Sequence, residues 1–136
     1  MPYIKVQTNQ KVDKEDEILK KLSAEMAEKI GKPESYVMTA LEADTKMTFA
    51  GSTEKTAFIQ IKSIGLKKSM TEELSHFICE FLENELGIEQ NRVYIEFKDA
   101  PGAMWGCNAG TFYFKEVLTL MAALITGYYI EKDYTK

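Results

Sequence analysis

The feature that most constrains the fold of this chain is an internal repeat. When the sequence is shifted by 56 residues without gaps, an apolar stripe at helical spacing in the first half falls on a similar stripe in the second. The matched pairs are Ile18 with Leu74, Leu22 with Ile78, Met26 with Leu82, Ile30 with Leu86, Gly31 with Gly87 and Val37 with Val93. Two amphipathic helices can match by chance, but the helix-stopping glycines match as well, which favours a repeat.

Each half of the repeat predicts a strand, a helix and a second strand. Alternating apolar and polar residues predict strands at 3–8, 36–43, 57–62 and 93–98. The first helix is expected to begin at an N-cap, Asp13, and to stop at Gly31. The second is expected to begin at the capping-box spacing of residues 69–72 and to stop at Gly87.

The two units together predict the fold class, α+β. Neither unit can bury its helix alone, so two β-α-β repeats should combine into a four-stranded mixed sheet with both helices on one face. Each helical crossover makes the strand pair within its unit parallel. The other face of the sheet and its short edge strands then need cover, which predicts oligomerisation.

Composition and charge exclude several classes of function. The 136 residues fit one domain, with a formal net charge of −4 and no basic tract, so no nucleic-acid partner is expected. His76, Cys79 and Cys107 show no metal-ligand spacing, and we expect no metal and no other cofactor. The uncharged apolar stretch 117–130 is too short to span a bilayer, so a membrane partner is not expected. The absence of a signal-peptide pattern predicts a cytoplasmic protein, although non-classical secretion would leave no mark.

Pro2 is the sharpest candidate for chemistry. Removal of Met1 would expose a proline secondary amine at the start of a predicted strand. An α-amino group has a pKa of roughly 8, and burial or a nearby cation lowers it further. The resulting neutral amine can move a proton between carbon and oxygen as a general base. The competing interpretation is that Met-Pro is simply a common start.

Two further segments offer sites for a substrate carboxylate. Lys32 follows the first helix-stopping glycine, where its ammonium can bind an anion and lower the pKa of Pro2. The competing interpretation is a solvated lysine at a helix C-terminus. Residues 62–65 (KSIG) predict a tight turn after the third strand, whose backbone N–H groups can bind a carboxylate oxygen.

These pieces together resemble one protein family. The sequence is similar to the macrophage migration inhibitory factor and D-dopachrome tautomerase family of the tautomerase superfamily. The resemblance rests on MPYIKVQTN at the start, GKPESYVM at 31–38, MTFAGSTE at 47–54, KSIG at 62–65, NRVYIEF at 91–97 and TF at 111–112. It covers residues 1–112, which we take as the tautomerase domain, with 113–136 as a C-terminal extension.

The resemblance implies a homotrimer with pockets between neighbouring subunits. It implies a cofactor-independent isomerase that catalyses keto–enol tautomerisation of phenylpyruvate-type and dopachrome-type substrates. Pro2 takes the place of the catalytic base. The substrate-binding positions that it implies are Lys32, Ile64 with Ser63 beside it, Tyr36, Phe112 and, from the neighbouring subunit, Tyr94.

The chain departs from the family pattern at two pocket positions. Glu96 replaces a pocket asparagine, where a carboxylate either repels an acidic substrate or points away from the pocket. Cys107 replaces a tryptophan at the pocket rim, while Trp105 lies two residues earlier. The alternative function is therefore a cytokine-like mimic or binding protein that meets a receptor if it is secreted, with weak or vestigial activity.

The extension 113–136 lies beyond the usual end of the family. Its apolar residues fall at helical spacing, which predicts a C-terminal helix packed on the trimer. The alternatives are a membrane-surface segment, disfavoured by the few flanking basic residues, or a partly disordered tail. Because the extension begins beside the expected pocket, it can narrow or cover the opening.

Overall fold

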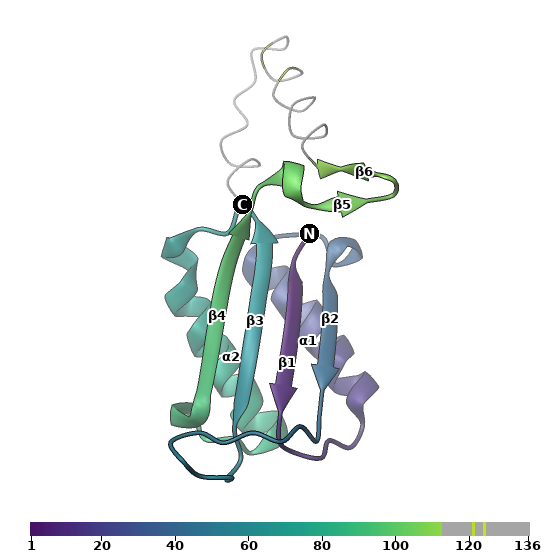
Figure 1. Ribbon diagram of the computed structural model, residues 1–136. Coiled ribbons are helices and arrows are strands. Elements are labelled where there is room, and N and C mark those ends of the chain that lie inside the picture. Colours follow the sequence, from purple (N-terminus) through teal and green to yellow (C-terminus); the bar gives the residue numbers. More distant parts are fainter. Residues whose placement is uncertain (113–120, 122–123, 125–136) are drawn as a thin grey trace.

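The computed structural model describes residues 1–112 together with Met121 and Leu124, and these form a sheet backed by two helices (Figure 1). The helices are α1 (Glu15–Ile30) and α2 (Thr71–Leu86). The four long strands are β1 (Tyr3–Thr8), β2 (Met38–Glu42), β3 (Ala57–Ile64) and β4 (Val93–Ala100). The short elements are the 3-10 turns η1 (Glu34–Tyr36), η2 (Lys68–Met70), η3 (Gln90–Arg92) and η4 (Gly102–Met104) and the two-residue strands β5 (Gly106–Cys107) and β6 (Gly110–Thr111).

The predicted α+β class and mixed sheet are confirmed. The strand order is β2-β1-β3-β4, with β1–β2 and β3–β4 parallel and β1–β3 antiparallel. Both helices lie on one face of this sheet (Figure 1). The parallel pairs lie within the two repeats, as a helical crossover between the strands of each repeat requires, and the antiparallel pair joins the repeats at the centre.

The repeat extends to the ends of the helices. A shift of 56 residues carries α1 onto α2 and η1 onto η3, residue for residue. Gly31 and Gly87 both end their helices in the left-handed conformation, with φ of 77° and 66°. Each glycine N–H donates to the carbonyl four residues earlier, to Ala27 at 2.9 Å and to Glu83 at 3.0 Å. The predicted stops are confirmed, because glycine accepts positive φ at little steric cost.

The predicted helix starts are wrong. Lys14, not Asp13, is the N-cap of α1, with φ of 53° and no side-chain capping bond. Met70 precedes α2, and the hydroxyl of Thr71 donates to the carbonyl of Lys68 instead of forming a capping box. A residue in the left-handed conformation, Lys14, before α1 and the 3-10 turn η2 before α2 therefore replace the side-chain caps that the local sequence favoured.

The core lies between the sheet and the helices. Ile4, Ile59 and Ile61 project from the central strands and are fully buried, with Ile4 opposite Ile61 in the register. They meet Met26 of α1 and Ile78 of α2, which are also fully buried. Burying each such side chain contributes about 1.5–3 kcal/mol, so this layer holds the sheet flat against both helices.

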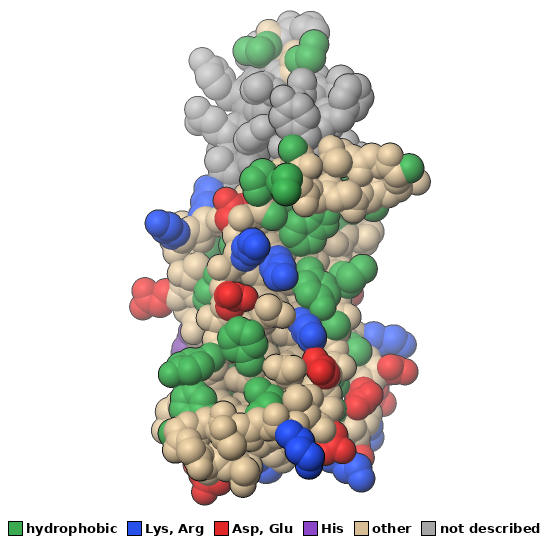
Figure 2. Space-filling view, in the orientation of Figure 1, with side chains coloured by type: hydrophobic (Ala, Val, Ile, Leu, Met, Phe, Trp, Pro, Cys, Tyr) green, Lys and Arg blue, Asp and Glu red, His purple; other side chains and the backbone are tan. Residues whose placement is uncertain are grey.

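The opposite face of the sheet carries no helix and is chemically mixed (Figure 2). Tyr94 and Met38 project from it with 65% and 64% of their surface exposed. Lys5 forms an ion pair with Glu42 at 3.0 Å on the same face. We call this surface the open face; it is the uncovered sheet surface that the sequence predicted.

One buried arginine organises the end of the molecule farthest from β5 and β6. Arg92 is 9% exposed and its guanidinium donates to the carbonyls of Lys55, Phe49, Ser52 and Glu54 at 2.9–3.3 Å. These carbonyls belong to the connection between β2 and β3. Because the fork of an arginine presents several donors at once, one side chain fixes the whole connection to the start of β4.

Among residues 1–112, 121 and 124, no helix is long and apolar enough to cross a membrane. The predicted C-terminal helix in 113–136 lies outside the described residues, apart from Met121 and Leu124, and stays a prediction. The same holds for the predicted boundary between a domain at 1–112 and the extension.

Candidate active site

A cavity of about 470 Å³ lies at the end of the sheet where β1 begins and β3 and β4 end. The β5–β6 hairpin lies over this end, close to the N-terminus (Figure 1). The cavity is lined by Met1, Pro2, Tyr3, Ser35, Tyr36, Val37, Met38, Lys62, Trp105, Gly106, Cys107 and Phe112. Four of the predicted site residues therefore meet here: Pro2, Tyr36, Cys107 and Phe112.

Pro2 is held rigidly at the base of this cavity. Its side chain is fully buried, and its carbonyl accepts a hydrogen bond from the N–H of Met38 at 2.9 Å. The next residue, Tyr3, already pairs with both β2 and β3. A chain end tied into the centre of a sheet does not fray, so its amine keeps a defined position.

The α-amino group in this cavity has a perturbed pKa. In the chain that carries Met1, burial and then the charge of Lys32 lower the pKa of the Met1 α-amino group from 8.0 to about 6. Both effects act by disfavouring the ammonium form. An amine at this end of β1 is therefore largely neutral at pH 7 and available to accept a proton.

Aromatic rings form one wall of the cavity. Phe112 is 4% exposed, and its ring meets the ring of Tyr36 edge to face at 6.3 Å. The Phe112 N–H donates to the carbonyl of Trp105 at 3.1 Å, which ties the wall to the hairpin. Cys107 lies on β5 and is exposed. The wall suits a planar, partly apolar ligand.

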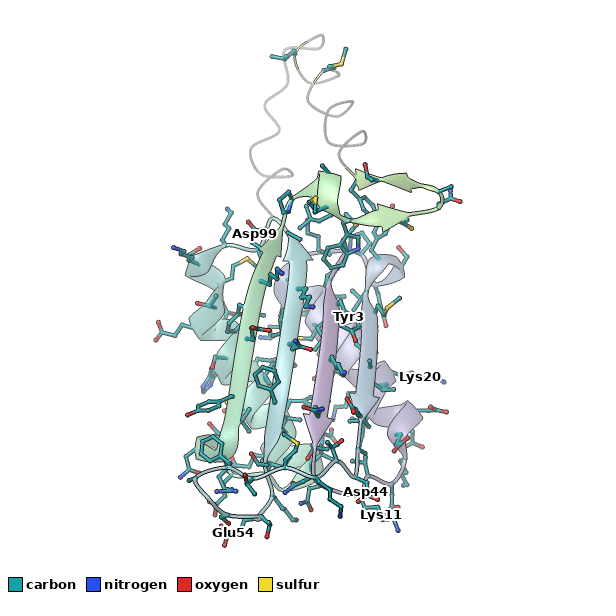
Figure 3. All side chains as sticks on the ribbon, viewed as in Figure 1. Tyr3, Lys11, Lys20, Asp44, Glu54 and Asp99 are labelled. Carbon is teal, nitrogen blue, oxygen red and sulfur yellow. The ribbon has the colours of Figure 1, made fainter. Side chains whose placement is uncertain are left out.

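The predicted carboxylate-binding turn differs from expectation. β3 continues to Ile64, and the turn falls at Gly65, with φ of 75°. The N–H groups of Gly65 and Leu66 donate to one carboxylate oxygen of Asp99, at 2.9 Å and 3.1 Å. Asp99 lies at the hairpin end of β4 (Figure 3). These two N–H groups are therefore occupied by the protein itself, which the local sequence did not reveal.

Ser63 and Ile64 do not line this cavity. Ser63 is fully buried in the strand row that faces the helices, and its hydroxyl lies 3.4 Å from the carbonyl of Ile64. Ile64 is also buried. Lys32 is half-buried and not part of the lining, although its charge reaches the α-amino group.

Tyr94 and Glu96 lie away from the cavity of their own chain. Both project from the open face of β4, and Tyr94 lies at the end opposite the hairpin, with its ring 4.8 Å from that of Phe49. Glu96 accepts a hydrogen bond from the amide of Gln60 at 3.2 Å. One chain therefore does not bring these two side chains to Pro2.

Sequence reasoning missed several lining residues. Tyr3 and Met38 enter the cavity because they are paired across the sheet, and Lys62 is paired with Tyr3 on the other side. Each alternates with a buried neighbour, so a period of two indicated that it faces away from the core. The register that makes them neighbours joins distant segments, and no local signal reports it.

A second, larger groove of about 1100 Å³ runs between α2 and β4. Cys79 and His76 lie on its wall, but burial raises the pKa of the Cys79 thiol, which favours its unreactive protonated form. His76 is exposed and lies 3.4 Å from Glu80. Within the described part of the chain, no three His, Cys, Asp or Glu side chains gather to hold a metal ion. The cavity at Pro2 is thus the better candidate for chemistry.

Known proteins resemble this chain over the same region. The family model described as macrophage migration inhibitory factor matches residues 1–113. A macrophage migration inhibitory factor homolog of Brugia malayi is 35% identical over 114 residues, covering 82% of this chain and 99% of the relative. The crystal structure of a homologue from Prochlorococcus marinus has a TM-score of 0.78 and 43% identity, covering 81% of this chain and 98% of that one. A macrophage migration inhibitory factor-like protein from Entamoeba histolytica has a TM-score of 0.76 and 34% identity, with coverage of 82% and 98%.

Proposed function

The chain belongs to the macrophage migration inhibitory factor family, and from this premise we propose that it is a cofactor-independent keto–enol tautomerase with Pro2 as its base. The proposed substrates are phenylpyruvate-type and dopachrome-type acids. One observation carries the proposal: a fully buried Pro2 immediately precedes β1 in an aromatic-walled cavity, and in the chain that carries Met1 the α-amino group beside it has a lowered pKa.

The proposed chemistry needs only proton movement. After removal of Met1, the neutral Pro2 amine accepts a proton from the carbon or hydroxyl of the substrate, and the resulting ammonium returns a proton to the oxygen or carbon. The charge on the developing enolate lies beside a cation, Lys32, which stabilises it. No σ bond other than those to hydrogen is made or broken, the π electrons shift between C=C and C=O, and no oxidant or reductant is consumed.

Substrate orientation is proposed to come from Lys32 and the end of β3. The ammonium of Lys32 is proposed to attract the substrate carboxylate. Asp99 occupies the N–H groups of Gly65 and Leu66, so the N–H of Ile64 is the backbone donor proposed there, and Ile64 would have to become accessible from the cavity, which it does not line in the single chain. Tyr36 and Phe112 would enclose the ring of the substrate.

A homotrimer is part of the proposal. The open face leaves Tyr94 and Met38 exposed, which favours cover by another copy of the chain. In the proposed trimer, Tyr94 and Glu96 of one subunit would reach the cavity of the next. Sedimentation or light scattering of the purified chain measures this directly, and a monomer at assay concentration would contradict it.

The activity is tested by following phenylpyruvate ketonisation with protein from which mass spectrometry shows Met1 to be absent. Pro2→Gly removes the secondary amine and should abolish most of the rate enhancement. Protein that retains Met1 is the matched control, because it keeps the whole cavity and moves the amine by one residue. Equal rates for wild type and Pro2→Gly would remove Pro2 as the base.

A cytokine-like binding role is the second candidate. It is favoured by the names of the relatives, which are macrophage migration inhibitory factors and their homologues, and by an exposed Cys107 at the cavity rim. It would require export, by a non-classical route, of a protein we otherwise propose to be cytoplasmic. Receptor binding by wild type and by a chain ending at residue 112 tests it; no binding to receptors of the kind that serve this family would count against it.

A further inference from the structure

A row of four side chains crosses the open face at the hairpin end of the sheet. The strand register pairs Met38 with Tyr3, Tyr3 with Lys62, and Lys62 with Lys98. Paired residues share a face, and adjacent strands lie about 4.8 Å apart. The row therefore runs from β2 to β4 and changes along its length from apolar to cationic.

The cavity covers the first three members of this row. Met38, Tyr3 and Lys62 line it, and Lys98 is the next residue beyond. Lys62 is half-buried and Lys98 is exposed. Blue side chains lie together over the upper part of β3 and β4, just below the hairpin (Figure 2). The cavity thus opens towards a pair of ammonium groups.

Lys62 and Lys98 are like charges at directly opposed positions, an arrangement that destabilises a sheet. Within the described residues, neither ammonium forms an ion pair or hydrogen bond with a protein side chain. The two nearest carboxylates along β4 have other partners. Glu96 accepts from Gln60, and Asp99 accepts from the turn after β3.

In the neighbouring row of the open face, a lysine is paired with a carboxylate. Lys5 lies two residues after Tyr3 on the same face, and it is neutralised by Glu42 at 3.0 Å. The sheet therefore pairs this lysine and leaves the two beside the cavity without a partner. An anion between Lys62 and Lys98 would remove their repulsion.

The position of this pair relative to Pro2 indicates what anion it would take. In the sheet, β2 lies on one side of β1, and β3 and β4, which carry Lys62 and Lys98, lie on the other. Lys32 lies in the connection from α1 to β2, and its charge reaches the α-amino group at the start of the chain. Pro2 immediately precedes β1. A ligand that places one anionic group towards Lys32 and its reacting carbon at Pro2 would extend its far end towards the lysine pair.

We propose that Lys62 and Lys98 form a subsite for a second anionic group, so that the preferred substrate is an aromatic 2-oxo acid carrying a carboxylate on its ring. This inference rests on the proposed tautomerase function and names its substrate class. The ring lies along the aromatic wall, the 2-oxo acid end lies at Pro2 and Lys32, and the ring carboxylate binds the pair. Lys98 acts in specificity and takes no part in proton transfer.

The test compares phenylpyruvate with 4-carboxyphenylpyruvate, which differ only in the ring carboxylate. Wild type should show a lower KM for the dianion, by about fivefold, the upper range for an ion pair near the surface. Lys98→Gln should raise the KM for the dianion by about the same factor and leave that for phenylpyruvate unchanged. Lys20→Gln on α1 (Figure 3) removes the same charge from a distant helix and should change neither.

Salt gives a second readout, because added NaCl screens exposed charges. In wild type, the ratio of the KM for phenylpyruvate to the KM for the dianion should fall as the NaCl concentration rises. In Lys98→Gln this ratio should not change with NaCl. Equal KM values for both substrates in wild type, or an equal effect of Lys98→Gln on both, would overturn the proposal. So would a change in the sedimentation of Lys98→Gln, which would place the pair at an interface between copies.

Calorimetric binding separates this proposal from the tautomerase proposal. If neither compound is turned over, the tautomerase proposal fails by itself. Tighter binding of the dianion than of phenylpyruvate, lost in Lys98→Gln and kept in Lys20→Gln, would still support the subsite. No preference for the dianion in binding would overturn the subsite even in an active enzyme.

Discussion

Replacing Lys32 tests the electrostatic basis of the proposed mechanism. In the chain that carries Met1, the pKa of the Met1 α-amino group falls from 8.0 to about 6 through two causes, burial first and the charge of Lys32 second. We expect the same two causes to lower the pKa of the Pro2 amine that removal of Met1 exposes. Lys32→Gln removes the second cause and leaves the first. The amine of the variant should therefore have a pKa above that of wild type and still below its ordinary value.

The size of the change can be bounded from the structure. The total lowering is about 2, and burial is the larger of the two causes, so Lys32 accounts for less than about 1. A wild-type Pro2 amine with the lowering shown for Met1 would be about half neutral at pH 6, and the amine of the variant would be at least roughly one-tenth neutral. The ionisation effect on kcat/KM at pH 6 is thus a decrease of less than about sixfold, and it vanishes above pH 8.

The assay is the pH dependence of kcat/KM for phenylpyruvate ketonisation, which reports ionisation of the free enzyme. Activity requires the neutral amine, so it should rise with pH. The wild-type midpoint should lie well below the ordinary pKa of an α-amino group, and Lys32→Gln should raise it by less than about 1. Lost carboxylate binding lowers the whole curve without moving its midpoint. Lys20→Gln is the charge-matched control. A wild-type midpoint near 8, or an unmoved midpoint in Lys32→Gln, would refute the reasoning.

Three further predictions concern stability. Arg92→Met should lower the free energy of unfolding by roughly 3 kcal/mol, because four carbonyls lose a charged donor; an urea midpoint within error of wild type would contradict this. Gly31→Ala and Gly87→Ala should each lower the free energy of unfolding by about 1 kcal/mol, because alanine is strained at positive φ. At Gly31 nothing lies within 4 Å of the added Cβ, so an unchanged urea midpoint for Gly31→Ala would exclude backbone strain. In protein retaining Met1, stability should rise between pH 6 and 8, because the unfolded amine holds a proton that the folded one has released; N-terminal acetylation should flatten that part of the slope, and an identical slope would count against it.

Much of the fold was predictable because its signals are local. The apolar stripes of both helices and the glycines at 31 and 87 are readable from neighbouring residues, and the helix stops are confirmed where predicted. The helix starts were wrong because Lys14 takes the N-cap place before α1 in a left-handed conformation, and because the hydroxyl of Thr71 bonds to Lys68 at the start of α2. Capping depends on the direction from which the chain enters the helix, which the sequence does not report.

The candidate site was predicted only in part. Pro2, Tyr36, Cys107 and Phe112 do line one cavity. Ser63 was predicted beside the substrate, yet strand alternation turns it towards the helices. Successive residues of a strand face opposite sides of the sheet, so a shift of one residue along β3 would reverse the face on which Ser63 lies. The position of Ser63 relative to Pro2 therefore depended on the residue at which the turn after β3 begins.

The sequence by itself determined the types of the elements, their order, the parallel pairing within each repeat and the chemistry available at the N-terminus. These follow from periodicity, glycine positions and the identity of residue 2, which are properties of short segments. Only the tertiary structure decided that Asp99 occupies the turn after β3, and that Met38, Tyr3, Lys62 and Lys98 form one row beside the cavity. Such contacts join segments far apart in the chain, and they exist only once both helices have packed on the sheet and set its register.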